Sequence, residues 1–144
     1  MKLDFQVGTS KKSHEIMKRL SGKTDDKKEP ANPKAPFKQM SNAYLFALVL
    51  GLSKGKKKPI EKKNRINVFQ FSSVEGDNDF SILLQHLGEP SDLVDKDSAR
   101  KAIEEYANWG LDSLGESKYG DDDYRIHKLL EEIGLGPMSS FVTD

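Results

Sequence analysis

The sequence predicts a mainly α protein, a small bundle of about five helices with at most one short strand or hairpin. Apolar residues recur three and four positions apart in several segments, one segment is apolar without interruption, and glycine or proline separates these segments. A chain of 144 residues has the usual length of one domain and can bury a core without disulfides or metals.

Residues 1–36 are predicted to hold a short helix followed by a flexible charged linker. Over residues 9–21, Thr9 and Ser10 are candidate N-caps. The apolar residues at helical spacing are Ile16, Met17 and Leu20. Residues 23–36 are charged, proline-rich and poor in large apolar side chains, so packing cannot offset their backbone entropy. We expect the helix to be a tethered arm that docks on the helical domain, residues 37–144, or on another chain.

The segment after the linker predicts a central buried helix. Residues 43–50 contain no charge, whereas a surface helix would show a polar stripe. Ser41 is a plausible N-cap, and Gly55 is the expected C′ residue because glycine adopts the left-handed conformation easily. The helix should end near Ser53, and Gly51 should let a neighbouring element approach closely.

A short strand and another helix are predicted next. Residues 66–71 are rich in β-branched and aromatic residues, which favours a strand. Residues 76–79 form a turn whose acidic residues can cap the following helix. That helix carries Phe80, Leu83, Leu84 and Leu87 at three- and four-residue spacing before Gly88 ends it.

Two further helices are predicted toward the end of the chain. The first begins at Asp97 as its N-cap and ends by Gly115. Its buried stripe is Ala99, Ile103, Tyr106, Gly110 and Leu114. The residues assigned to its other faces are Arg100, Lys101, Glu104 and Glu105. The second helix covers residues 126–133, after the acidic run of residues 121–123, and is closed by glycine and proline.

The composition excludes several classes of protein. The chain has no cysteine, which excludes disulfide frameworks, thiolate nucleophiles, zinc ribbons and iron–sulfur clusters and suits a reducing compartment. Its longest apolar run, residues 43–52, is about half a membrane span, and its first residues do not resemble a signal peptide. We expect a soluble cytoplasmic protein without a cofactor and without contact to a membrane.

Charge is distributed unequally along the chain. Through Arg65 there are 17 Lys and Arg against 6 Asp and Glu, a net charge of +11, and from Ile66 onward there are 6 against 17, a net charge of −11. Such halves can neutralise each other within one fold, present two faces of opposite sign, or bind copies of the chain or a partner.

The densest feature is a basic loop, residues 54–65, directly after the buried helix. Its cations are Lys54, Lys56, Lys57, Lys58, Lys62, Lys63 and Arg65. Three interpretations fit: a surface for double-stranded DNA, a surface for an acidic protein partner, or a solubilising loop. The predominance of lysine without interleaved aromatic residues argues against reading of bases or of single strands.

Signals for catalysis are weak. Residues 121–123 could bind a divalent cation in a small metal-dependent nuclease, although capping of the following helix explains them better. The chain has no nucleophile elbow, and the glycines after residue 50 lack the spacing of a phosphate-binding loop. We therefore expect a protein that is not an enzyme.

Two stretches carry a family resemblance. Residues 37–52, which run into Gly55-Lys-Lys-Lys-Pro59, and residues 103–112 resemble the small proteins encoded beside bacterial DNA phosphorothioation and related antiphage defence genes. The resemblance implies an accessory subunit of a defence complex in which larger subunits, an ATPase or a nuclease, do the enzymatic work. It implies no catalytic residue and no small-molecule substrate. The alternative is a scaffolding module that binds no nucleic acid.

Overall fold

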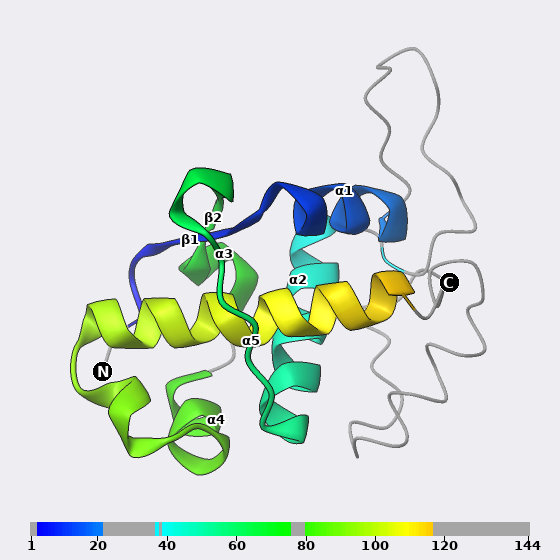
Figure 1. Ribbon diagram of the computed structural model, residues 1–144. Helices are drawn as coiled ribbons and strands as arrows, with labels where there is room; N and C mark the ends of the chain where they lie inside the picture. Colours follow the sequence, from blue (N-terminus) through cyan, green and yellow to red (C-terminus); the bar gives the residue numbers. More distant parts are fainter. Residues whose placement is uncertain (1–2, 22–36, 38, 76–79, 117–144) are drawn as a thin grey trace.

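The computed structural model describes residues 3–21, 37, 39–75 and 80–116. It confirms the mainly α class with a short antiparallel sheet (Figure 1). The elements are β1 (Gln6–Ser10), α1 (Lys11–Leu20), α2 (Met40–Lys54), the 3-10 turn η1 (Lys62–Asn64), β2 (Arg65–Gln70), α3 (Phe71–Glu75), α4 (Phe80–Leu87), the 3-10 turn η2 (Pro90–Leu93) and α5 (Lys96–Glu116). The predicted linker, the turn at 76–79, the helix at 126–133 and the acidic run at 121–123 lie outside the described residues.

The centre of the fold is the crossing of α2 and α5 (Figure 1). A Cβ atom added to Gly110 of α5 would lie 2.1 Å from the carbonyl oxygen of Ala47, and one added to Gly51 of α2 would lie 2.3 Å from that of Tyr106. The two helix backbones can approach this closely only because neither glycine has a side chain. The close approach expected at Gly51 is therefore confirmed.

Helix α2 is buried on every side, as its uninterrupted apolar sequence predicts. Its C-terminus is closed at Gly55, whose φ of 64° is left-handed, while the N–H of Lys56 donates to the carbonyl of Gly51 at 3.0 Å. The predicted N-cap was wrong by two positions. The carbonyl of Gln39 accepts the first helical bond, from Ala43 at 3.3 Å, so Ser41 lies inside the first turn.

The strands β1 and β2 pair antiparallel, with Gln6 opposite Gln70 and Ser10 opposite Arg65. The strand predicted at 66–71 is confirmed, shifted by one residue at each end. Strand β1 was not predicted from the sequence. Gly8 permits this pairing, since a Cβ atom there would lie 2.7 Å from the carbonyl oxygen of Ile66.

Helix α1 docks on the main body of the chain, which was one of the two arrangements expected for the N-terminal arm. Met17 and Leu20 are fully buried, and the N–H of Phe37 donates to the carbonyl of Leu20 at 3.1 Å. Ser10 caps the helix as predicted, because its hydroxyl accepts the N–H of Ser13 at 3.1 Å. The boundary predicted between residues 36 and 37 stays a prediction.

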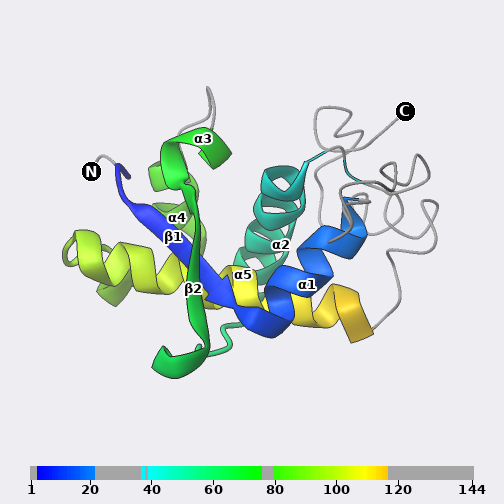
Figure 2. The same cartoon turned by 90° about the horizontal axis from the view of Figure 1, so that it is seen from above.

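Helix α5 carries the predicted buried stripe along its contact with α2. Its predicted cap was wrong: the carboxylate of Asp95 accepts the N–H of Ser98 at 2.8 Å, and Asp97 lies in the first turn. The sheet and α1 lie on one side of α5, and α4 lies on the other (Figures 1 and 2). None of the described helices is both long enough and apolar enough to span a bilayer.

Candidate functional site

The basic loop runs from the end of α2 across α5 to β2 (Figure 1). Hydrogen bonds to Glu105 and Asn108 fasten its backbone to α5. The N–H of Lys58 donates to the carbonyl of Glu105 at 3.0 Å, and the side-chain amide of Asn108 donates to the carbonyl of Lys58 at 3.1 Å. Because Asn108 is buried, the loop has a fixed base on the helix.

Three cations of the loop, which we call the inward cations, turn back onto the chain. Lys57 pairs with Asp92 at 2.7 Å, Lys58 with Asp112 at 2.9 Å, and Arg65 with Glu104 at 2.6 Å. Each of the three carboxylates comes from the acidic half of the sequence. This part of the charge asymmetry is therefore neutralised within the molecule.

Asp92 receives Lys57 in a nearly buried site at the start of η2. Its carboxylate also accepts the hydroxyl of Tyr106 at 3.1 Å and the N–H of Glu89 at 2.8 Å. The ammonium of Lys57 lies 5.0 Å from the centre of the Tyr106 ring, a distance typical of a cation–π contact. Burial, followed by the charge of Asp92, raises the pKa of Tyr106, so this hydroxyl stays a hydrogen-bond donor.

Asp112 joins the loop to α1. Its carboxylate pairs with Lys58 and with Lys12, each at 2.9 Å. Burial alone would raise the pKa of Asp112, but the hydrogen bonds from the two lysines outweigh burial and lower it. Asp112 is thus held ionised between two positive groups.

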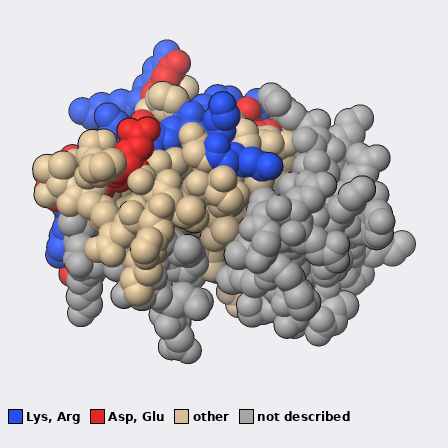
Figure 3. Space-filling model, turned by 90° about the horizontal axis from the view of Figure 1, so that it is seen from below, with Lys and Arg blue, Asp and Glu red and all other residues tan. Residues whose placement is uncertain are grey.

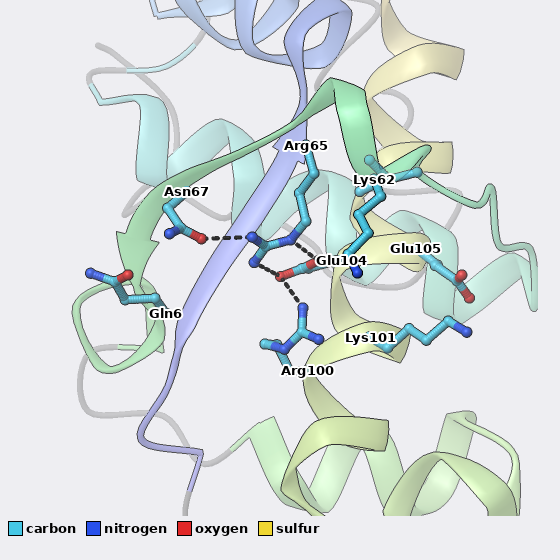
Figure 4. A pocket seen from close by; sticks show the side chains of 9 residues that line it. Gln6, Lys62, Arg65, Asn67, Arg100, Lys101, Glu104 and Glu105 are labelled. Atoms are coloured by element: carbon cyan, nitrogen blue, oxygen red, sulfur yellow. Dashed lines mark hydrogen bonds and ion pairs between the residues drawn. The ribbon is translucent and has the colours of Figure 1, made fainter.

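Glu104 is the centre of a buried ion cluster. Its carboxylate accepts the N–H of Gly8 at 2.8 Å, Nε and Nη2 of Arg65 at 2.9 and 2.6 Å, and Nη1 of Arg100 at 3.0 Å (Figure 4). Burial raises the pKa of Glu104, but the hydrogen bonds from Arg65 and Gly8 outweigh it and lower the pKa. Three of these donors bind Oε2 and one binds Oε1, so four hydrogen bonds hold the carboxylate in place, which suits a structural role.

Glu104 was expected to lie outside the buried stripe of α5, yet only 4 % of it is exposed. A second apolar stripe of α5 could have predicted the burial of Glu104 from the sequence. Ala107 and Leu111 follow Glu104 at helical spacing and are buried, so position 104 belongs to a face that packs against the rest of the chain. A carboxylate on such a face needs cationic partners, which Arg65 and Arg100 provide.

The remaining cations of the loop, which we call the outward cations, are exposed: Lys54, Lys56, Lys62 and Lys63. Lys63 lies 3.6 Å from Glu61, with both side chains largely in solvent. Within the described parts of the chain, the other three make no ion pair. Figure 3 shows Lys and Arg side chains gathered along one edge of the face that it views, beside a broad uncharged area.

A cleft of about 690 Å³ opens where the loop, the sheet and α5 meet (Figure 4). Its lining residues are Gln6, Ile60, Lys62, Arg65, Asn67, Arg100, Lys101, Glu104 and Glu105. Four of these are cations and two are carboxylates, which leaves two positive charges in excess. A smaller hollow of about 180 Å³ adjoins it, because Lys101 and Glu105 line both.

The cleft joins residues that the sequence analysis treated separately. It brings Lys62 and Arg65 of the predicted basic loop together with Arg100 and Lys101 of α5. In the described ranges, no three His, Asp or Glu side chains converge as metal ligands would. The acidic run proposed for a nuclease, residues 121–123, lies outside those ranges.

Comparison with known proteins identifies the family. The family model described as DNA sulphur modification system-associated protein 4 matches residues 6–133, which is most of the chain. A search of curated proteins and a search of solved structures each returned no match. The match begins with β1 and includes the basic loop, the cleft and α5. The chain therefore belongs to the family of DNA sulphur modification system-associated protein 4.

Proposed function

We propose that this protein is a non-enzymatic accessory subunit of a bacterial DNA sulphur modification system and that its outward cations contact the backbone of double-stranded DNA. One observation carries the proposal: the outward cations are exposed on a loop that the inward cations fasten to η2 and α5. Membership of the family supports a place in a system that acts on DNA.

The fixed base of the loop favours binding of a polyanion. A loop that is ordered before binding loses less conformational entropy on association than a free tail of the same charge. Lysines that contact phosphate release counterions and supply affinity without reading sequence. We therefore expect similar affinity for duplexes of different sequence and strong weakening by salt.

The enzymatic steps of the system belong to larger partner subunits in this proposal, such as an ATPase or a nuclease. The buried carboxylate of Glu104 supports this division of work, because two arginines and a backbone N–H already hold it. The proposed setting is the cytoplasm of a bacterium, in a complex that acts against phage DNA. No cofactor is part of the proposal.

A pair of matched variants tests the DNA contact. Lys54→Gln with Lys56→Gln removes two outward charges, while Lys11→Gln with Arg19→Gln removes two exposed charges from α1. Each lost phosphate contact should reduce the slope of log K against log salt by about 0.9 and cost roughly a factor of three in affinity. We expect about tenfold weaker duplex binding for the loop variant and little change for the α1 variant.

Fluorescence anisotropy with a labelled duplex at several salt concentrations measures both quantities. Equal slopes for the two variants would contradict the proposed contact. Failure of the wild-type protein to bind duplex at low salt, together with salt-sensitive association with an acidic partner subunit, would instead support the scaffolding alternative.

A further inference from the structure

We infer that the cleft between the sheet and α5 seats a phosphate group of the DNA backbone, with Arg65 and Arg100 as the hydrogen-bond donors. The inference rests on the proposed function and adds a specific phosphate seat to the general attraction of the outward cations. Figure 4 shows both guanidinium groups converging on Glu104 while Lys62 and Lys101 lie beside them at the cleft.

The arginines keep donors for a ligand after their contacts within the chain are counted. A guanidinium has five N–H groups. Arg65 uses three of them, two on Glu104 and one on Asn67 at 2.8 Å, and therefore keeps two. Arg100 uses two, on Glu104 and on Asp97 at 3.0 Å, and keeps three. A phosphate diester has two non-bridging oxygens, which share one negative charge and accept such donors.

Glu104 fixes the orientation of both guanidinium groups. One carboxylate between two arginines leaves a net positive charge on this group of three, and the cations Lys62 and Lys101 add to it. In the described residues neither lysine has an ionic partner that would compete with a ligand. A concave surface with excess positive charge concentrates anions more strongly than a flat one of equal charge.

The lining favours a phosphate over an acidic peptide. Ile60 is the one apolar residue among the nine that line the cleft. Protein interfaces derive most of their binding energy from buried aromatic and other large anchors, and this cleft has no pocket lined for one. A nucleic-acid backbone needs charge and N–H donors, which the cleft has.

The adjoining hollow continues the same surface. Lys101 lies between the two hollows, and Lys57 lines the smaller one. A DNA strand seated in the cleft would pass Lys101 as it leaves.

Two variants of the full chain test the phosphate seat. Lys62→Gln with Lys101→Gln alters exposed side chains, so folding should be preserved. We expect about tenfold weaker duplex binding and a lower salt slope than in the control Lys11→Gln with Arg19→Gln. Arg100→Lys keeps the charge but loses the planar fork. It should weaken binding about threefold or more while the salt slope stays near that of the wild type.

Arginine Nε–H resonances provide a direct readout. Titration of the wild-type protein with a short duplex should shift the signals of Arg65 and Arg100, and should leave that of Arg19 unchanged. Cleft variants that bind like the control, with unshifted arginine signals, would overturn the phosphate seat. If the Lys54 and Lys56 variant is then weakened, the proposed function survives without it, whereas normal binding by every variant overturns both.

Discussion

The inward and outward cations share one loop and differ in what surrounds them. The inward cations each lie within 2.9 Å of a carboxylate that is at most 14 % exposed. Within the described ranges, the one ion pair of the outward cations joins side chains that are 81 % and 68 % exposed. Lys56 and Lys57 are adjacent lysines, yet the side chain of Lys56 is exposed and that of Lys57 is partly buried.

The difference separates two roles that the charge asymmetry of the sequence combined. Internal neutralisation explains the inward cations, because each of them supplies an ionic partner to a carboxylate that is mostly shielded from solvent. It does not explain the outward cations, because the described residues around them offer one solvent-exposed carboxylate, that of Glu61. A variant that changes inward and outward cations together could lose DNA binding because it unfolds. Variants that change one group at a time separate the effect on stability from the effect on binding.

The largest expected effect is at Glu104. Replacement by alanine leaves Arg65 and Arg100 without their buried partner and the N–H of Gly8 unsatisfied. We expect the free energy of unfolding to fall by about 3–5 kcal/mol, measured by urea denaturation. The neighbouring Glu105→Ala, at a side chain without an ion pair among the described residues, should change it by less than about 0.5 kcal/mol. Equal effects of the two substitutions would show that the cluster contributes nothing.

A smaller effect should follow from acid. The pKa values of Glu104 and Asp112 are lowered in the folded protein, whereas the unfolded chain has ordinary values of about 4.3 and 3.9. The unfolded state then binds more protons in this range, so stability rises with pH. The contribution of both groups is complete above the unfolded pKa and is lost as pH falls through the lowered folded pKa.

The free energy of unfolding, measured by urea denaturation at pH 7, 4.5 and 3, can show the contribution of the inward ion pairs. The Glu104→Gln variant is less stable at neutral pH but lacks one of the two titrating groups. Its stability should therefore decline less steeply with acid than that of the wild type. Parallel curves would show that Glu104 has the same pKa in the folded and unfolded states.

The smallest expected effect on stability belongs to the outward cations. Lys54→Gln with Lys56→Gln removes no ion pair within the described chain, so we expect a change within about 0.5 kcal/mol by thermal or urea denaturation. The same variant should bind duplex DNA about tenfold more weakly, so its loss of affinity would not come from loss of folding. A destabilisation of 2 kcal/mol or more, on the order of that for a buried contact, would remove the distinction between the two groups of cations.

The positions of the long helices were largely predictable. The signals that define them, the spacing of apolar residues and the glycine or proline at helix ends, lie within a few residues of each other. The apolar run of α2 and the glycine at 55 predicted both the burial of this helix and its end. The caps were less predictable. Ser41 and Asp97 have good capping side chains, yet each helix begins before them, since the first accepted hydrogen bonds fall on Gln39 and Asp95.

The pairing of β1 with β2 could not be predicted in the same way. Residues 6–10 are too short and too polar to show a strand pattern, and their partner lies far along the chain. Tertiary contacts decide this pairing. The N–H of Gly8 is held by Glu104, and its carbonyl accepts the hydroxyl of Tyr44 at 3.2 Å.

Four features could be predicted from the sequence alone. They are the helical class, the buried central helix, the basic loop that follows it and the opposite charges of the two halves. These features depend on residues a few positions apart or on composition, and both can be read from the sequence without knowing the fold. The pairing of the inward cations with carboxylates of η2 and α5 is visible only in the folded protein. The same is true of the exposure of the four outward cations of the loop. The physical reason is that an ion pair depends on distance in space, and the crossing of α2 and α5 sets those distances between residues far apart in sequence.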